Sequence, residues 1–357
     1  MSRQTRAIIH ADALIHNFEV LAALSPDSNT IAVIKADAYG HGAVNVATIL
    51  TGRCQCYGVA ISEEALLLRE AGINEPIVIF EGAHQQQECE RAARLNCILV
   101  AHNFQQLDWL MDTPKDQRPP VWIKIDSGMH RLGFDPSQVE YIMSEYADLV
   151  TAETVLVTHL ACAEDISNTF TQQQLDEFAQ LQRRYSFKSS IANSSATLGW
   201  PASRAAWNRI GIALFGGGPL PQLNDIPPLK PAMTLEASVM SLRTIAPGES
   251  VGYGQTWIAQ RKSVIATVSI GYADGYPRHC PNGTPTVIRG ERAPLVGRVS
   301  MDMITVDVTD VPATQLGDKV ELWGTQVSID EVAERAGTIS YELMTRISPR
   351  VPRIISK

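Results

Sequence analysis

Lys35 stands at the end of an apolar run, Ala32-Val33-Ile34, and precedes the segment Ala36-Asp37-Ala38-Tyr39-Gly40-His41-Gly42. Burial disfavours an ammonium group, so we expect a lysine that closes a buried strand to be shifted toward the neutral amine, which can form a Schiff base with a carbonyl. The glycine-rich segment can bring backbone N–H groups close to an anion, and Tyr39 can donate to it. Lysine and anion site together suggest pyridoxal phosphate. A lysine whose charged end reaches solvent is the alternative for Lys35.

A second stretch joins a lysine and an arginine through a glycine turn, from Lys124 through Asp126 and Gly128 to Arg131. Two cations near a strand end can bind a ring oxygen of the cofactor or a substrate carboxylate. From the spacing of these residues alone, a solvent-exposed loop without a binding role is an equally good interpretation of this stretch. Four further residues also have ordinary structural explanations: a core histidine for His159, an ion-pair partner for Arg209, a turn residue for Tyr253 and core packing for Met301.

The elements that must position these residues alternate between short apolar runs and helical patterns from residue 30 to about 215. The pattern predicts an α/β fold, an N-terminal parallel (β/α)8 TIM-type barrel. Its eight strands are expected at Ala32 to Lys35, Tyr57 to Ala60, Ile77 to Phe80, Cys97 to Val100, Val121 to Ile125, Thr154 to Thr158, Ser190 to Asn193 and Gly211 to Phe215.

A barrel of this kind places its chemistry at the carboxyl ends of the strands. Lys35, Lys124 and His159 fall there, as do Asn193 and Arg209. The loops after strands seven and eight are the usual phosphate site of the fold. We therefore expect Ser194 and the backbone amides of Gly211 and Ile212 to bind a phosphate group.

Beyond Pro231 the pattern changes to β-rich segments separated by Pro-Gly, Asn-Gly and Arg-Gly turns. The sequence predicts a barrel over residues 10–230 and a mostly antiparallel β domain over 231–357, with residues 1–9 adding a strand to the second domain. A cluster of prolines, including Pro219, Pro221 and Pro227, marks a boundary near 220–235.

The composition of the 357 residues limits the partners. A net charge of -8 and a pI near 5.5, without a basic block, argue against nucleic acid or an anionic membrane. No apolar segment suits a signal peptide or a membrane span, and six scattered cysteines without zinc-site spacing predict reduced thiols, a cytoplasmic location and no metal.

Several motifs resemble the alanine racemase family of barrel-type pyridoxal-phosphate enzymes, in the family's order along nearly the whole chain. They are the segment from Val33 to Gly42, the pattern Lys124-x-Asp126-x-Gly128-Met129-x-Arg131, and the segments Gly271 to Tyr276 and Gly297 to Met303. Two positions depart from the family: Asp37 replaces a common asparagine, and Pro349 stands where many members carry a tyrosine near the phosphate.

The resemblance implies roles for individual residues. Lys35 would act on the Cα proton of the D-enantiomer and Tyr253 on that of the L-enantiomer, with His159 and Arg209 lowering the pKa of Tyr253. Arg209 would face the pyridine nitrogen and leave it unprotonated. Lys124 would be carbamylated and hold Arg131 toward the substrate.

The resemblance also implies a homodimer whose active sites are completed in trans. The partner subunit would contribute Tyr253, Tyr272, Met301 and Asp302, with the Met301 amide binding the substrate carboxylate and Tyr272 lining the entrance.

The expected function is therefore interconversion of L- and D-alanine, supplying D-alanine for peptidoglycan. A broad-specificity amino-acid racemase and a non-catalytic pyridoxal-phosphate carrier are the alternatives. A carrier would not need Tyr253 and Met301, and a decarboxylase on this scaffold would place an acidic residue, rather than Arg209, at the pyridine nitrogen.

Overall fold

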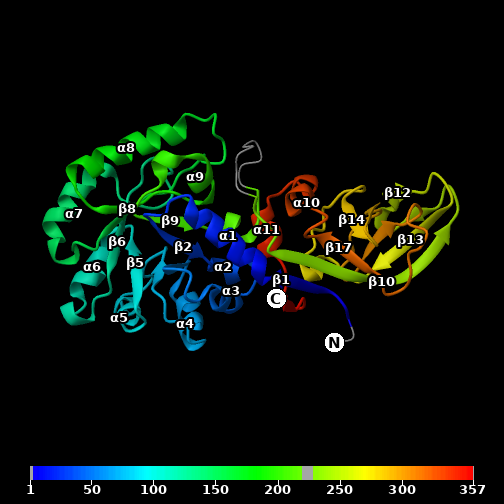
Figure 1. The fold of residues 1–357 in the computed structure, drawn as a ribbon, viewed down its shortest axis with the longest axis horizontal. Helices are drawn as coiled ribbons and strands as arrows, with labels where there is room; N and C mark the ends of the chain where they lie inside the picture. Colours follow the sequence, from blue (N-terminus) through cyan, green and yellow to red (C-terminus); the bar gives the residue numbers. More distant parts are fainter. Residues whose placement is uncertain (1–2, 219–227, 357) are drawn as a thin grey trace.

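The chain forms two lobes that lie end to end (Figure 1). The computed structural model describes residues 3–218 and 228–356. One lobe is a helix-covered barrel, and the other is a β-rich domain of mostly antiparallel strands. The prolines at 219, 221 and 227, which mark the expected boundary between the domains, lie outside the described residues.

Eight parallel strands form the barrel sheet, in the order β8-β7-β6-β5-β4-β3-β2-β9. Most of their residues are buried, as expected where side chains fill the barrel on one side and helices cover the other. Between β8 and β9 the Arg209 amide donates to the Ala192 carbonyl at 3.0 Å, which brings the ends of the sheet together. The strands are β2 Asn29–Val33, β3 Cys56–Val59, β4 Ile77–Ile79, β5 Cys97–Ala101, β6 Val121–Lys124, β7 Val155–Val157, β8 Lys188–Ser190 and β9 Trp207–Ile210.

The fold class is as predicted, but the eighth strand is not where the sequence placed it. The strand is Trp207–Ile210, and the apolar run expected to form it is a 3-10 helix, η5, at Ile212–Phe215. Gly211, with φ -111° and ψ -99°, ends the extended backbone. A short apolar run has no periodicity that separates a buried strand from a buried helical turn.

Helices follow the strands and cover the barrel. The longest described helix of this lobe, α8 at Phe170–Arg184, buries Leu175, Phe178 and Leu181 along one face. The other α-helices are α1 Ala11–Ala23, α3 Ala43–Leu50, α4 Ser62–Glu70, α5 Gln87–Arg94, α6 Phe104–Asp112, α7 Val139–Glu145 and α9 Ser194–Gly199.

The second lobe is built on the 13-residue strand β10, Met233–Ile245, which pairs antiparallel with three strands. One of them is β1, Arg6–His10, which also pairs in parallel with β18, Arg353–Ser356. The remaining strands are β11 Ser250–Val251, β12 Trp257–Ile258, β13 Ser263–Val268, β14 Pro285–Ile288, β15 Glu291–Pro294, β16 Ile304–Asp307 and β17 Lys319–Trp323. Both ends of the chain therefore belong to the sheet of this lobe.

Two helices of the second lobe, α10 at Ile329–Ala336 and α11 at Ser340–Thr345, lie toward the barrel (Figure 1). Helix α11 packs so closely on the barrel that a Cβ added at Gly40 would lie 2.1 Å from the Met344 carbonyl oxygen. In the described part of the chain, no helix combines the length and apolar character needed to cross a membrane.

Candidate active site

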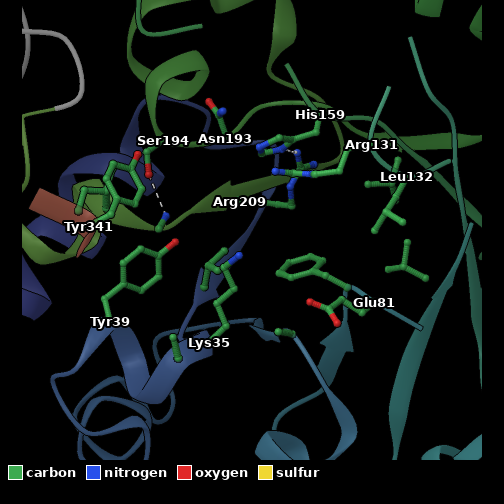
Figure 2. Close-up of a pocket in the computed structure, with 18 of the residues that line it drawn as sticks. Lys35, Tyr39, Glu81, Arg131, Leu132, His159, Asn193, Ser194, Arg209 and Tyr341 are labelled. Carbon is green, nitrogen blue, oxygen red and sulfur yellow. Dashed lines mark hydrogen bonds between the residues drawn. The ribbon is translucent and has the colours of Figure 1, made fainter. Parts of the chain in front are cut away.

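A cavity of about 750 Å³ opens at the carboxyl ends of the barrel strands (Figure 2). This is the end of the barrel at which the sequence placed the chemistry. The structure brings together ten of the predicted residues in the cavity wall: Lys35, Tyr39, Lys124, Arg131, His159, Asn193, Ser194, Arg209, Gly211 and Ile212.

The cavity lysine lies on an unusual backbone segment. Strand β2 ends at Val33, and Lys35 begins a left-handed turn, α2 Lys35–Tyr39, in which Ala36 to Tyr39 all have φ between 52° and 54°. Left-handed backbone costs roughly 1–2 kcal/mol for each L-residue with a Cβ. The expectation of a buried lysine at a strand end is wrong for the single chain, because this turn leaves Lys35 exposed.

Contacts from other elements hold the turn. The Asp37 carboxylate accepts the first amide of α3, from Ala43, at 2.8 Å, and Glu64 accepts the Ala36 amide at 2.6 Å. Arg353 from β18 donates to the Gly40 carbonyl at 2.9 Å. Asp37 therefore serves as an acceptor in place of the family's asparagine, and its negative charge also lies near Arg353.

An anion site lies at one end of the cavity. The Ser194 hydroxyl oxygen accepts the Gly211 amide at 2.8 Å and the Ala213 amide at 3.3 Å, so its own proton is free to be donated. The Tyr39 hydroxyl lies so close to Gly211 that a Cβ there would be 2.6 Å from it. Within the described chain the Ile212 amide has no acceptor, and Asn193 caps α9 through Ala196 at 2.9 Å.

Arg209 is the most firmly held cation of the site. Its guanidinium donates to Ser190, Thr158 and Ile191 at the ends of the neighbouring strands, over 2.7–3.0 Å. Burial lowers its pKa to about 10, which still leaves it charged at neutral pH. It also donates to Nδ1 of His159 at 3.1 Å, so this nitrogen must be an acceptor.

Burial and the nearby cations Arg209 and Lys124 hold the pKa of His159 well below its usual value. The imidazole is therefore neutral, and with Nδ1 accepting from Arg209 its proton lies on Nε2.

Lys124 ends strand β6 beside Arg131, and burial together with Arg209 and Arg131 lowers its pKa to about 7. Burial acts against the ionisation of Asp126, but the His130 and Gly128 amides still hold the pKa of its carboxyl below the usual value. A fraction of Lys124 is thus a neutral amine at physiological pH, as a reaction with carbon dioxide requires.

Sequence reasoning missed Tyr341. Helix α11 places its ring 5.9 Å from the Tyr39 ring at the anion end of the cavity (Figure 2). The family resemblance places a tyrosine eight positions later, where this chain has Pro349. Glu81, after strand β4, also lines the cavity, and its carboxylate lies 3.2 Å from Nε2 of His84. Only its position after a strand could have indicated it.

Four predicted residues lie away from this cavity, on the β lobe. The side chains of Tyr253, Tyr272 and Met301 are 68%, 41% and 53% exposed, and Asp302 pairs with Arg350 at 2.7 Å. The loop of Tyr272 is joined to the loop of Met301 and Asp302, because the Tyr272 amide donates to the Ser300 carbonyl at 3.0 Å and the Ala273 amide to the Met301 carbonyl at 2.9 Å. None of the four belongs to the cavity wall of its own chain.

Comparison with known proteins identifies the family of this chain. Residues 9–219 match the family described as alanine racemase, N-terminal domain, and residues 232–355 match alanine racemase, C-terminal domain. The chain is 57% identical to an alanine racemase of Alteromonas mediterranea, over 99% of both chains, and 44% identical to a biosynthetic alanine racemase of Pseudomonas aeruginosa, over 97% and 98%.

Solved structures give the same result. A crystal structure of the biosynthetic alanine racemase from Pseudomonas aeruginosa matches with a TM-score of 0.95 and 43% identity, over 99% of this chain and 100% of that one. Another, from Bartonella henselae with covalently bound pyridoxal phosphate, matches with a TM-score of 0.90 and 32% identity, over 99% of both chains. The chain therefore belongs to the alanine racemase family.

Proposed function

We propose that this protein interconverts L- and D-alanine with pyridoxal 5'-phosphate as its cofactor. The observation that carries the proposal is the cavity in which Lys35, Arg209 and the anion site around Ser194 converge, in a chain of this family. The D-alanine would supply peptidoglycan synthesis in the cytoplasm.

The residues present fit the cofactor. The hydroxyl groups of Tyr39 and Ser194 and the Ile212 amide are donors suited to a phosphate, and the close approach at Gly211 leaves no room there for a side chain. Lys35, open to the cavity, supplies the amine for covalent attachment. When bound, pyridoxal phosphate withdraws electrons from the amino acid and makes its Cα proton removable.

Two residues of this chain would move that proton. The Lys35 amine would take or return it on one face of Cα, for the D-enantiomer, and the Tyr253 hydroxyl on the opposite face, for the L-enantiomer. Arg209 would face the ring nitrogen. Since a guanidinium does not give up its proton at neutral pH, that nitrogen would remain unprotonated.

We infer from the surroundings of Lys124 that its amine is carbamylated. The cavity wall gathers Lys35, Lys124, Arg131 and Arg209. The neutral Lys124 amine would attack carbon dioxide, forming an N–C bond and releasing one proton, so that the neutral amine would become a carbamate anion. That anion would pair with Arg131 and hold it toward the substrate carboxylate.

A homodimer would complete the site. Tyr253, Tyr272 and Met301 are each exposed on the β lobe, and exposed large apolar side chains are typical of protein interfaces. We infer that the partner subunit presents this group and Asp302 to the cavity, with the Met301 amide binding the substrate carboxylate and Tyr272 lining the entrance.

The test is Cα–H exchange in D2O, followed by proton NMR with chiral analysis, for protein supplied with pyridoxal phosphate and a panel of L-amino acids. Exchange and racemisation confined to alanine, with some serine, would support the proposal. Equal turnover of basic or bulky amino acids would assign a broad-specificity racemase instead. If the protein binds pyridoxal phosphate but no amino acid exchanges its Cα proton, the protein is a non-catalytic carrier.

A further inference from the structure

His41 is a completely buried residue that the proposed reaction does not use. It lies two residues after the left-handed turn Lys35–Tyr39, with Gly40 between them. Its Nδ1 lies 3.0 Å from the Ala38 carbonyl and 3.1 Å from the Tyr39 carbonyl. Two carbonyl oxygens can only accept, so Nδ1 must carry the proton of the imidazole.

The same ring also touches the other side of the anion site. It stacks on Phe215 with 4.4 Å between the ring centres and 29° between their planes. Phe215 is the last residue of η5, whose first residue, Ile212, presents the free amide of the anion site. The Tyr39 ring packs on Phe215 as well, at 4.9 Å.

A side chain that only filled space would not need this polar arrangement. Within the described chain, Nε2 of His41 is buried and has no hydrogen-bond partner, so an apolar ring would avoid the cost of burying that nitrogen. What histidine adds over an apolar ring is the N–H directed at the turn. A strained backbone needs such contacts in order to persist, and Ala36 to Tyr39 are all left-handed.

We propose that His41 is a positioning residue that couples the Lys35–Tyr39 turn to η5, and so holds the lysine and the phosphate donors in one fixed relation. The hydrogen bonds fix the turn and the stack fixes η5. Lys35 would bind the aldehyde of pyridoxal phosphate and the Ile212 amide would bind its phosphate, so binding of the cofactor would depend on both segments. The inference rests on the proposed function, because it concerns retention of that cofactor.

Two substitutions test separately the hydrogen bonds of His41 to the turn and its stacking on Phe215. His41→Phe keeps a ring against Phe215 but has no donor, and we expect pyridoxal phosphate to leave the holoenzyme roughly tenfold faster. His41→Asn keeps a donor near the Nδ1 position but loses the stack, and we expect release to be accelerated about threefold. In both, kcat should fall while KM for alanine changes less than about twofold, because Arg131 is untouched. His16→Asn, on α1 outside the cavity wall, is the control.

Release is measured on folded holoenzyme, by trapping the freed cofactor, with circular dichroism to verify folding. Release at the wild-type rate from both folded variants would overturn the inference. If neither folds, Phe215→Leu decides: it keeps His41 and its hydrogen bonds, and an unchanged release rate would equally overturn the coupling. Wild-type protein that retains no pyridoxal phosphate would instead overturn the proposed function itself.

Discussion

Lys124 gives the cavity a defined dependence on pH. Its pKa is about 7 in the folded chain because of burial and the neighbouring Arg209 and Arg131, against about 10.4 for a free lysine. Between these values the unfolded chain binds more protons than the folded one. The free energy of unfolding therefore falls as the pH decreases from 10.4 to 7, and the cost is fully present below pH 7.

Carbamylation would remove this cost by replacing the ammonium group with an anion. At pH 8 we expect added bicarbonate to raise the unfolding temperature of the wild type and to lower KM for alanine. Lys124→Met should abolish both responses. Lys188→Met, an exposed lysine paired with Glu153, is the control and should respond as the wild type does. A bicarbonate response that persists in Lys124→Met would assign the effect to another group.

The hydrogen bonds of Arg209 lead to a prediction about stability that does not depend on catalysis. Its guanidinium satisfies acceptors on Ser190, Thr158, Ile191 and His159, more than the three protons of an ammonium can serve. Arg209→Lys should lower the free energy of unfolding by about 1–3 kcal/mol, the usual cost of leaving buried acceptors unpaired, as measured by urea denaturation.

The matched control for this change is Arg184→Lys. Arg184 pairs with Glu140 on the surface, where both side chains are more than half exposed. Its change should stay below about 0.5 kcal/mol. Equal losses in the two variants would mean that the hydrogen bonds of Arg209 do not stabilise the barrel.

At the level of elements, the contact between α11 and the Lys35 turn can be tested with two glycines. Gly40 and Gly72 both have left-handed backbone, with φ of 78° and 83°. A Cβ at Gly40 would lie 2.1 Å from the Met344 carbonyl oxygen, whereas one at Gly72 would have no atom within 4 Å. Gly72→Ala should lower the free energy of unfolding only by the cost of placing a residue with a Cβ in left-handed backbone, about 1 kcal/mol.

Gly40→Ala must also displace α11, which carries Tyr341 at the anion end of the cavity. We expect a larger loss of stability than for Gly72→Ala, together with weaker binding of pyridoxal phosphate. The measurements are urea denaturation and cofactor titration. If the two variants lose the same free energy and bind the cofactor alike, the packing of α11 does not support the site.

The elements also show what the sequence could and could not predict. The alternation of apolar runs and helical patterns was sufficient to predict the barrel. The residues at the ends of the expected strands were sufficient to predict most of the polar residues in the cavity wall. The left-handed turn was not predictable, because Ala36, Ala38 and Tyr39 have no local preference for positive φ. Tyr341 was missed because only the docking of α11, a long-range contact, places it near Tyr39.

At the scale of the whole molecule, the proposed dimer predicts complementation between two defective chains. Lys35→Ala and Tyr253→Phe should each be nearly inactive alone. If Tyr253 acts on the partner's cavity, a mixed dimer contains one site with both residues intact. Subunits exchanged at random should then recover roughly a quarter of the wild-type activity.

Activity after subunit exchange is the measurement, with each variant exchanged against itself as the control. If Tyr253 instead served its own chain, every site in the mixture would carry one substitution. No recovery, despite mixed dimers detected by native mass spectrometry, would therefore contradict completion in trans.

The pairing of β1 has a consequence for how this protein is made. Strand β1 precedes the barrel in the chain and its neighbours β10 and β18 follow the barrel, so β1 leaves the ribosome before either of them. At about 5–20 residues per second, the roughly 220 residues between β1 and β10 take about 10–45 s to translate. The barrel can form during that delay while β1 is still unpaired, so the sheet of the second lobe is completed only after the barrel has been translated.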